Sequence, residues 1–330
     1  MSNKQDSLIE IRFEELKSSK NLPSPTGVAL EIIRLTQEPG LALDDLLRPI
    51  QSDPALAGRL LKIANSAASA GTTHAISIKD ALLRVGTSAL TNLALSLSIL
   101  DNNRQGSCPA FDYDSFWQTS LLRGLALRQI ALQLQAAGKR LALMPEESFA
   151  VGLLSEIGRL ALAQIHPDLY AECLRNQCGN LLALEREAFL MTHQQISIEM
   201  MRDWELPEIV LHAVRIALGE CCQNSGVGGD DQAIELANML RLANYLTGEL
   251  GLDAGIQSMA SIVGHLGLSY VDLEQIRCML FKEWRSWGEL LYLPVDDFNE
   301  LFGETGLLSD ANHSSDKLRV LVGASTLARA

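Results

Sequence analysis

The chain has 330 residues, a formal net charge of −13 and 47% hydrophobic residues, and aromatic residues make up only 5% of it. This apolar content excludes a largely disordered chain and allows one large domain or two small ones. The acidic charge is not offset by any local cluster of lysine and arginine, so direct binding of DNA or RNA phosphates is disfavoured.

Cysteine usage and hydropathy indicate the compartment. The six cysteines are scattered without a CxxC pair, so we expect free thiols in a reducing environment and no zinc site. The N-terminus, MSNKQDSLIE, lacks an apolar signal core. The longest apolar stretch, from Ala89 to Leu100, is too short and too often interrupted by polar residues to span a membrane. We therefore expect a cytoplasmic protein without a membrane contact.

Apolar residues recur with a spacing near 3.6 along most of the chain, which predicts helices. In SDPALAGRLLKIANSA, Asp53 and Pro54 mark a helix start; in SIKDALLRVG, Ser77 is a capping residue and Gly86 ends the helix. Further helices are expected at about 25–37, 43–51, 88–102, 113–137, 146–164, 167–176, 181–190, 194–203 and 206–218. No segment has the pattern of a strand, so the predicted fold class is all-α.

A polar, glycine-rich stretch at 221–230 predicts a linker. It separates a lead-in helix at 1–20 and a main helical domain at 21–220 from a helical C-terminal extension at 231–330. Within the extension, helices are expected near 231–250, 255–264, 271–290 and 295–302. The sequence leaves open whether the extension is a separate domain or packs on the main one.

A series of motifs over roughly 22–218 resembles HDOD proteins, a bacterial group related to the HD-type metal phosphohydrolases. The motifs are NLPSPTGVALEIIRL, LLRPIQSDPALAGRLLKIANSA, ISIKDALLRVG, FWQTSLLRGLALRQIA, FAVGLLSEIGRLAL and THQQISIEMMRDWELPEIVLHAV, followed by LRLANYL. They occur in the order in which the family would place them. The resemblance implies an HD-like (HDOD) multi-helix bundle.

In HD-type enzymes, imidazoles and carboxylates from several helices converge on one or two metals that activate a water for attack on phosphorus. By the resemblance, the matching positions in this chain are Gln118, Ser155, Glu156, His193, Ala217, Leu218 and Asn244. Only His193 keeps a usual ligand type, and a hydroxyl, an amide and one carboxylate are poor substitutes for His and Asp at a transition metal. The resemblance therefore implies a vestigial HD site with no metal, no cofactor and no catalytic residue.

Two of these residues have alternative interpretations. Glu156 falls at the edge of an apolar helix face, and Arg159 is three residues on, within reach of an ion pair. We interpret Glu156 as a boundary carboxylate in preference to a ligand or general base. His193 is the best single candidate for a retained site residue, although a structural role is the commoner one for such a histidine. Gly152 and Gly158, which flank Glu156, predict close helix packing.

The stretch DPALAGRLLKIANSA is the part of the family pattern that we expect to matter most. Its notable residues are Asp53, Pro54, Arg59 and Asn65. Capping accounts for Asp53 and Pro54. Asn65 could end its helix, or hydrogen-bond into a groove between the N-terminal and HD-like helices. We prefer fold maintenance to ligand contact for this motif.

In the HDOD family this module is typically an output or scaffolding domain, often joined to receiver, diguanylate cyclase or phosphodiesterase domains. The resemblance thus implies a non-catalytic regulatory module of bacterial signal transduction that acts through protein–protein contacts. Because about twenty residues precede the matched region, we expect a stand-alone version. Its partner could be a sensor kinase, a response regulator or a cyclic-dinucleotide enzyme.

Trp284 and Trp287, in FKEWRSWGELLYL, could anchor a partner surface, although buried aromatics at this spacing are the commoner case. Two other functions stay open at this point. One is a residual metal-dependent phosphohydrolase, and the other is a sensor that binds a nucleotide or cyclic dinucleotide in the vestigial cleft.

Overall fold

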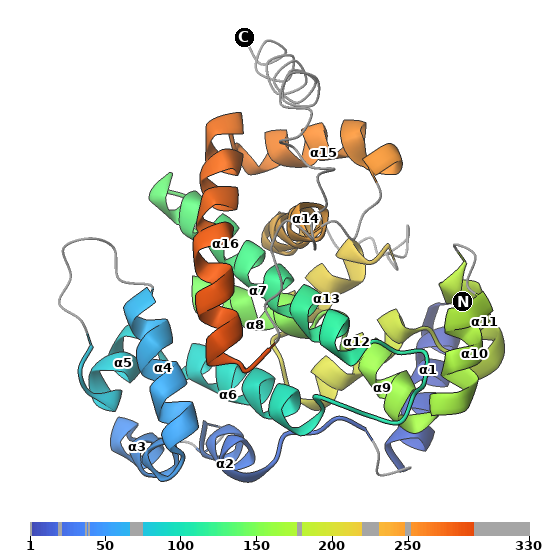
Figure 1. Cartoon of the computed structure of the whole chain (residues 1–330), viewed down its shortest axis with the longest axis horizontal. Coiled ribbons are helices and arrows are strands. Elements are labelled where there is room, and N and C mark those ends of the chain that lie inside the picture. The colour runs from blue at the N-terminus through green and yellow to red at the C-terminus, as the bar shows by residue number, and fades with distance from the viewer. Residues whose placement is uncertain are drawn as a thin grey trace. The chain divides into compact units, whose positions relative to one another are not determined.

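The computed structural model describes residues 2–18, 22–36, 38, 40–66, 75–176, 180–219, 231–247 and 252–293. Within these ranges the regular secondary structure is helical and no strand occurs, which confirms the predicted all-α class (Figure 1). The predicted linker at 221–230, the predicted helix at 295–302 and the rest of the chain beyond residue 293 lie outside the described residues.

Residues Leu22–Gly106 form one compact unit. Its helices are α2 (Gly27–Thr36), α3 (Leu43–Ser52), α4 (Pro54–Ser66), α5 (Ile78–Val85) and α6 (Thr87–Asn102). The predicted caps are confirmed: the Ser77 hydroxyl accepts the backbone N–H of Asp80 at 3.0 Å, and Gly86 ends α5. Gly86 has φ of 86°, a conformation that glycine adopts without strain, and the chain bends by 106° between α5 and α6.

The second compact unit contains residues 1–21 and 107–330. Its helices are α1 (Ser2–Ser18), α7 (Tyr113–Ala136), α8 (Pro145–Leu154), α9 (Ile157–Ile165), α10 (Pro167–Asn176), α11 (Leu181–Phe189), α12 (His193–Asp203), α13 (Glu208–Ala217), α14 (Asp231–Leu246), α15 (Leu252–Leu266) and α16 (Tyr270–Leu290). The long helix α7 lies at the centre of this unit, where α8, α14 and α16 all pack against it (Figure 1).

The helices that follow residue 230 share a core with the helices before it. Trp287 of α16 packs on Phe149 of α8, with 4.7 Å between ring centroids. Glu283 of α16 accepts hydrogen bonds from Arg128 at 3.4 Å and from Gln129 at 2.9 Å, both on α7. The described part of the predicted extension therefore packs on α7 and α8. The compact units divide the chain at Gly106, a position that the sequence pattern does not mark.

Two close helix crossings depend on glycine. A Cβ atom at Gly152 of α8 would lie 2.7 Å from the Cα atom of Gly124 on α7. A Cβ atom at Gly158 of α9 would lie only 1.9 Å from the carbonyl oxygen of His193 on α12. Both distances are far below van der Waals contact, so only glycine allows these backbones to approach so closely. This confirms the predicted packing role of Gly152 and Gly158.

The single helix predicted at 146–164 is wrong, because the chain breaks at Ser155 and Glu156, between α8 and α9. Glu156 has φ of −109° and ψ of 19°, outside the helical range. The backbone N–H of Gly158 donates to the Ser197 hydroxyl of α12 at 2.9 Å, a tertiary contact that no helix periodicity reveals. The 145–165 stretch is long and apolar enough to cross a membrane, but 78% of its most apolar window is buried in the protein.

Candidate functional site

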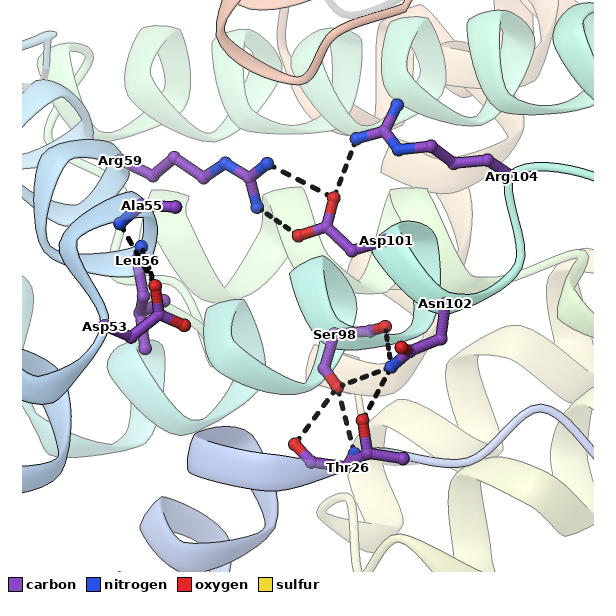
Figure 2. A network of polar contacts seen from close by, with 9 residues as sticks. All are labelled: Thr26, Asp53, Ala55, Leu56, Arg59, Ser98, Asp101, Asn102 and Arg104. Carbon is purple, nitrogen blue, oxygen red and sulfur yellow. Dashed lines mark hydrogen bonds and ion pairs between the residues drawn. The ribbon is translucent and has the colours of Figure 1, made fainter.

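The family-motif residues near α4 have structural contacts. The Asp53 carboxylate accepts the backbone N–H groups of Ala55 and Leu56, both at 3.0 Å, and so caps α4 at its first residue, Pro54 (Figure 2). The Asn65 side chain bonds twice to the backbone of Ala75, accepting its N–H at 2.7 Å and donating to its carbonyl at 3.0 Å. Asn65 therefore holds a loop end, and the groove contact considered for it is not the one that it makes.

Arg59 is 5% exposed and donates from both terminal nitrogens to Asp101 of α6, at 2.5 and 3.2 Å. Figure 2 shows Arg59 and Arg104 reaching Asp101 from two sides, with the Arg104 contact at 2.7 Å. Burial would raise the pKa of Asp101, but these hydrogen bonds outweigh it and lower that pKa. Beside this ion cluster, the Asn102 amide donates to the Thr26 hydroxyl at 2.7 Å (Figure 2). Within the motif, Arg59 thus joins α4 to α6, and a structural role for these residues agrees with their contacts.

Two of the residues matched to HD metal ligands meet in a buried ion triad. His193, the first residue of α12, places Nε2 3.1 Å from the carboxylate of Glu156 at the break before α9. Its Nδ1 lies 2.7 Å from the carboxylate of Glu185 on α11, which also accepts the backbone N–H of His193 at 2.9 Å. All three residues are buried, with Glu185 fully inaccessible. Both imidazole nitrogens therefore have a carboxylate partner.

The triad favours ionised groups. Burial alone would lower the pKa of His193, but the hydrogen bonds and charges of Glu156 and Glu185 raise it to about 9. Burial alone would raise the pKa of Glu156, but His193, and then Arg123 and Arg159, lower it to about 2. At neutral pH the His193 imidazolium thus has a donor at each ring nitrogen, one facing Glu156 and the other Glu185. The sequence places Arg159 within reach of Glu156, and its charge does act on Glu156, but the hydrogen bond to Glu156 comes from His193 and the carboxylate is buried, not at a helix boundary.

Ser155 has a cation as its neighbour. The buried guanidinium of Arg123, on α7, lies 3.3 Å from the Ser155 hydroxyl and 3.4 Å from the carbonyl oxygen of Gly152. The same hydroxyl donates to that carbonyl at 3.1 Å. The position that the resemblance assigns to a metal-binding imidazole therefore holds a hydroxyl beside a positive charge, which disfavours a divalent cation there.

The remaining matched positions carry no ionisable group. Gln118 is buried on α7. Ala217 ends α13 and Leu218 follows it; there the Ala217 carbonyl accepts from Arg241 of α14 at 3.4 Å. Asn244 of α14 is half-buried, and its amide oxygen has no hydrogen-bond partner among the described residues.

This donor set does not fit the metal that HD-type chemistry needs. A metal-bound histidine coordinates through a deprotonated nitrogen, whereas His193 is held as an imidazolium with carboxylates on both sides. Arg123 and Arg159 add positive charge beside Glu156. Over the described ranges of the chain, no three His, Cys, Asp or Glu side chains are grouped so that they could hold a metal ion.

Trp284 and Trp287 are each only 2% exposed. The prediction that they could anchor a partner surface is therefore wrong, and both are core residues of α16. Cys108, Cys173 and Cys278 are free thiols, as expected, whereas Cys178, Cys221 and Cys222 lie outside the described residues.

Glu185 and Arg123 were missed by the sequence reasoning. Glu185 lies on α11 in LLALEREAF, a helix with the charge pattern of an ordinary surface helix. Arg123 lies in the middle of α7, where the sequence pattern alone would place an arginine on the solvent-facing side. Glu185 and Arg123 differ from surface residues because each is buried beside an opposite charge or a polar partner. Tertiary packing decides that burial, so the sequence does not show it. The presence of a histidine after a capping Thr192 was the one signal near the triad.

The model of the HDOD domain family matches residues 22–217 of this chain, more than half of it. An uncharacterized protein of Treponema pallidum is 26% identical over 204 residues, which cover 59% of this chain but only 37% of that protein. The MmoQ response regulator of Methylococcus capsulatus is 34% identical, with a TM-score of 0.44 and coverage of 78% of this chain and 98% of that one. An HDOD domain protein of unknown function from Geobacter sulfurreducens shares the fold, with 17% identity, a TM-score of 0.58 and coverage of 90% and 99%.

Proposed function

Since this chain belongs to the HDOD family, we propose that it is a non-catalytic regulatory module of signal transduction that works by contact with a protein partner in the cytoplasm. A signalling role agrees with the family, whose modules serve as output domains. One observation carries the non-catalytic part of the proposal. The histidine and the acid left at the vestigial metal site are bound to each other, with His193 also held by Glu185.

This arrangement does not favour the alternative of a residual metal phosphohydrolase. A metal would have to displace the proton of His193, whose pKa is raised to about 9, and break both of its carboxylate contacts. The remaining positions would offer Gln118, Ser155 and Asn244, which are neutral oxygen or nitrogen donors. We therefore assign the buried triad a structural role in joining α9, α11 and α12.

A partner surface requires accessible apolar side chains. Ile76 is 88% exposed and Leu83 of α5 is 66% exposed, and both lie in the family-matched stretch ISIKDALLRVG. Val271, on α16 and outside the family match, is similarly exposed at 61%. We place the partner contact at Ile76 and Leu83, which makes Val271 a matched control residue of comparable size and exposure.

The test is affinity capture of the full-length chain from cells that normally make it, with partners quantified by mass spectrometry. We expect one or a few signalling proteins near stoichiometric amount. Leu83→Glu should reduce their recovery about tenfold or more, as for a central interface residue. Val271→Glu should leave recovery unchanged. Recovery of chaperones alone, or equal loss with both variants, would contradict the proposal.

A further inference from the structure

A cavity of about 340 Å³ opens between the first turn of α7 and helices α9 and α10. Two arginines line it: Arg159 comes from α9 and the exposed Arg175 from the end of α10. Phe111 and Phe116, which are 7% and 6% exposed, add a small apolar surface to the lining; their ring centroids are 5.3 Å apart. None of the residues matched to the HD metal ligands is in its lining.

The charge of the cavity suits an anion. Asp112 is the one acid in the lining, and its carboxylate already accepts the backbone N–H of Ser115 at 2.9 Å as the cap of α7. The two guanidinium groups leave a net positive charge, and the N-terminal end of α7 adds the positive end of a helix dipole. The exposed guanidinium of Arg175 presents a planar fork of N–H donors that matches the oxygens of a phosphate or carboxylate. Arg159, whose guanidinium also contacts Tyr170, adds a second positive charge to the cavity wall.

The size and lining favour one kind of anion. A terminal phosphate monoester carries close to two negative charges at neutral pH, which two arginines balance. The cavity volume lies at the lower end of the range for small-molecule sites. A volume of this size accommodates one nucleotide, whereas a cyclic dinucleotide needs room for a second nucleotide. The phosphates of a cyclic dinucleotide are also diesters with one charge each. The edges of Phe111 and Phe116 offer an apolar contact for a planar base.

We propose that this cavity binds a mononucleotide through its terminal phosphate, with Arg159 and Arg175 holding the phosphate and Phe111 and Phe116 contacting the base. Arg159 is the third residue beyond Glu156, and its charge also acts on Glu156 and on the buried Tyr170. Occupancy of the cavity therefore acts on the same arginine that faces the ion triad. The site does not depend on the proposed protein partner, so the two proposals can fail separately.

The test is isothermal titration calorimetry of the full-length chain with AMP, GMP, CMP and UMP, each compared with its nucleoside and with inorganic phosphate at equal ionic strength. We expect saturable one-to-one binding of at least one mononucleotide. Its nucleoside and inorganic phosphate should each bind at least tenfold more weakly, because the nucleoside lacks the phosphate and inorganic phosphate lacks the base. The absence of saturable binding by all four nucleotides at millimolar concentration would overturn the proposal, as would equal affinity for inorganic phosphate alone.

Matched variants locate the site. Arg175→Gln should weaken binding about tenfold or more, and because Arg175 is exposed the melting temperature should not change. Arg140→Gln removes an equally exposed arginine of the same unit outside the cavity lining and should bind like the wild type. Ser115→Tyr, at an exposed lining position, should block the cavity while leaving the fold intact. Unchanged affinity in both Arg175→Gln and Ser115→Tyr would show that the nucleotide binds elsewhere.

Discussion

His193 and Glu156, at two positions that match the HD metal ligands, are bound to each other in this structure. Each is of a type that can bind a metal, yet the structure places them 3.1 Å apart with Glu185 on the far side of the imidazole. Charged groups taken out of water in this way require good geometry and further hydrogen bonds to offset their desolvation. The backbone N–H of His193, which donates to Glu185, supplies one of them.

The triad makes stability depend on pH in a defined direction. The pKa of His193 is raised from 6.5 to about 9, so its contribution is complete below pH 6.5 and is lost as the pH rises through about 9. The pKa of Glu156 is lowered from 4.5 to about 2, so its contribution is complete above pH 4.5 and is lost as the pH falls toward 2. The contribution of the triad to the free energy of unfolding should therefore be largest between pH 4.5 and 6.5.

Glu185→Gln tests this prediction through urea unfolding at a series of pH values. Removing one carboxylate should lower the free energy of unfolding near pH 6 by about 1 to 3 kcal/mol, the cost of losing a buried hydrogen bond to a charged group. It should also flatten the loss of stability between pH 6.5 and 9, because the pKa of His193 then rises less. Glu187→Gln, an exposed position on the same helix, is the control and should keep the wild-type profile. Identical profiles for the two variants would contradict the role of the triad.

At the residue scale, the sequence predicts well what is decided locally. Asp53 and Ser77 cap helices as their positions indicate, because a cap depends on neighbours two or three residues away. The contact between Glu156 and His193 joins the start of α9 to the start of α12, and its third member, Glu185, comes from α11. No local sequence pattern shows which helices meet. Glu156 and His193 could therefore be identified as site positions from the sequence, but their contact with each other and with Glu185 could not.

At the scale of helices, the crossing of α9 and α12 depends on one missing methyl group. Gly158→Ala would place Cβ 1.9 Å from the His193 carbonyl oxygen. This oxygen belongs to the backbone, which cannot move aside as the end of a flexible side chain can. We expect a loss of about 3 kcal/mol or more in the free energy of unfolding, at the upper end of overpacking effects. Because that crossing also positions His193, the variant should lose the pH dependence described above.

Gly58→Ala is the matched control for Gly158→Ala, and both are followed by thermal and urea unfolding. Gly58 is an exposed interior residue of α4, and a Cβ there meets no atom within 4 Å. Alanine should therefore raise the free energy of unfolding by about 0.5 to 1 kcal/mol through its better helix propensity. If Gly158→Ala proved as benign as Gly58→Ala, the close crossing would be disproved.

Helical periodicity predicts the existence and order of the elements, because an amphipathic helix encodes its own buried face. It fails at Ser155 and Glu156, where an apolar stretch continues through the break between α8 and α9. The break is stabilised by contacts with other helices, including the Gly158 N–H to Ser197 hydrogen bond. Periodicity also cannot show which helices share a core, and it left open the placement of α14 and α16.

At the scale of the whole molecule, the helices after residue 230 are part of a core and not a detachable extension. A chain that ends at Gly219 would lose Trp287 from its contact with Phe149 and Glu283 from its contact with the fully buried Arg128. Arg128 would keep Glu146 at 3.6 Å, but the apolar face of α7 that α14 and α16 cover would be exposed to water, which removes a large share of the stability of a typical domain. We expect this truncated chain to lack a cooperative unfolding transition when followed by circular dichroism in urea.

A chain that ends at Leu293 keeps α14, α15 and α16 and is the control, for which we expect a cooperative transition. A cooperative transition of wild-type stability in the chain ending at Gly219 would show that the later helices are an independent addition. For the same reason, substitutions at the surface test partner binding better than truncation does.

If the Glu156–His193–Glu185 triad stands in place of an HD-type metal centre, the protein should hold no stoichiometric metal ion. Elemental analysis of the purified full-length protein by mass spectrometry, after expression in medium supplemented with iron, manganese and zinc, tests this. We expect well under one metal ion per chain, and the same background in His193→Ala as in the wild type. Stoichiometric metal in the wild type that disappears in His193→Ala would contradict this expectation.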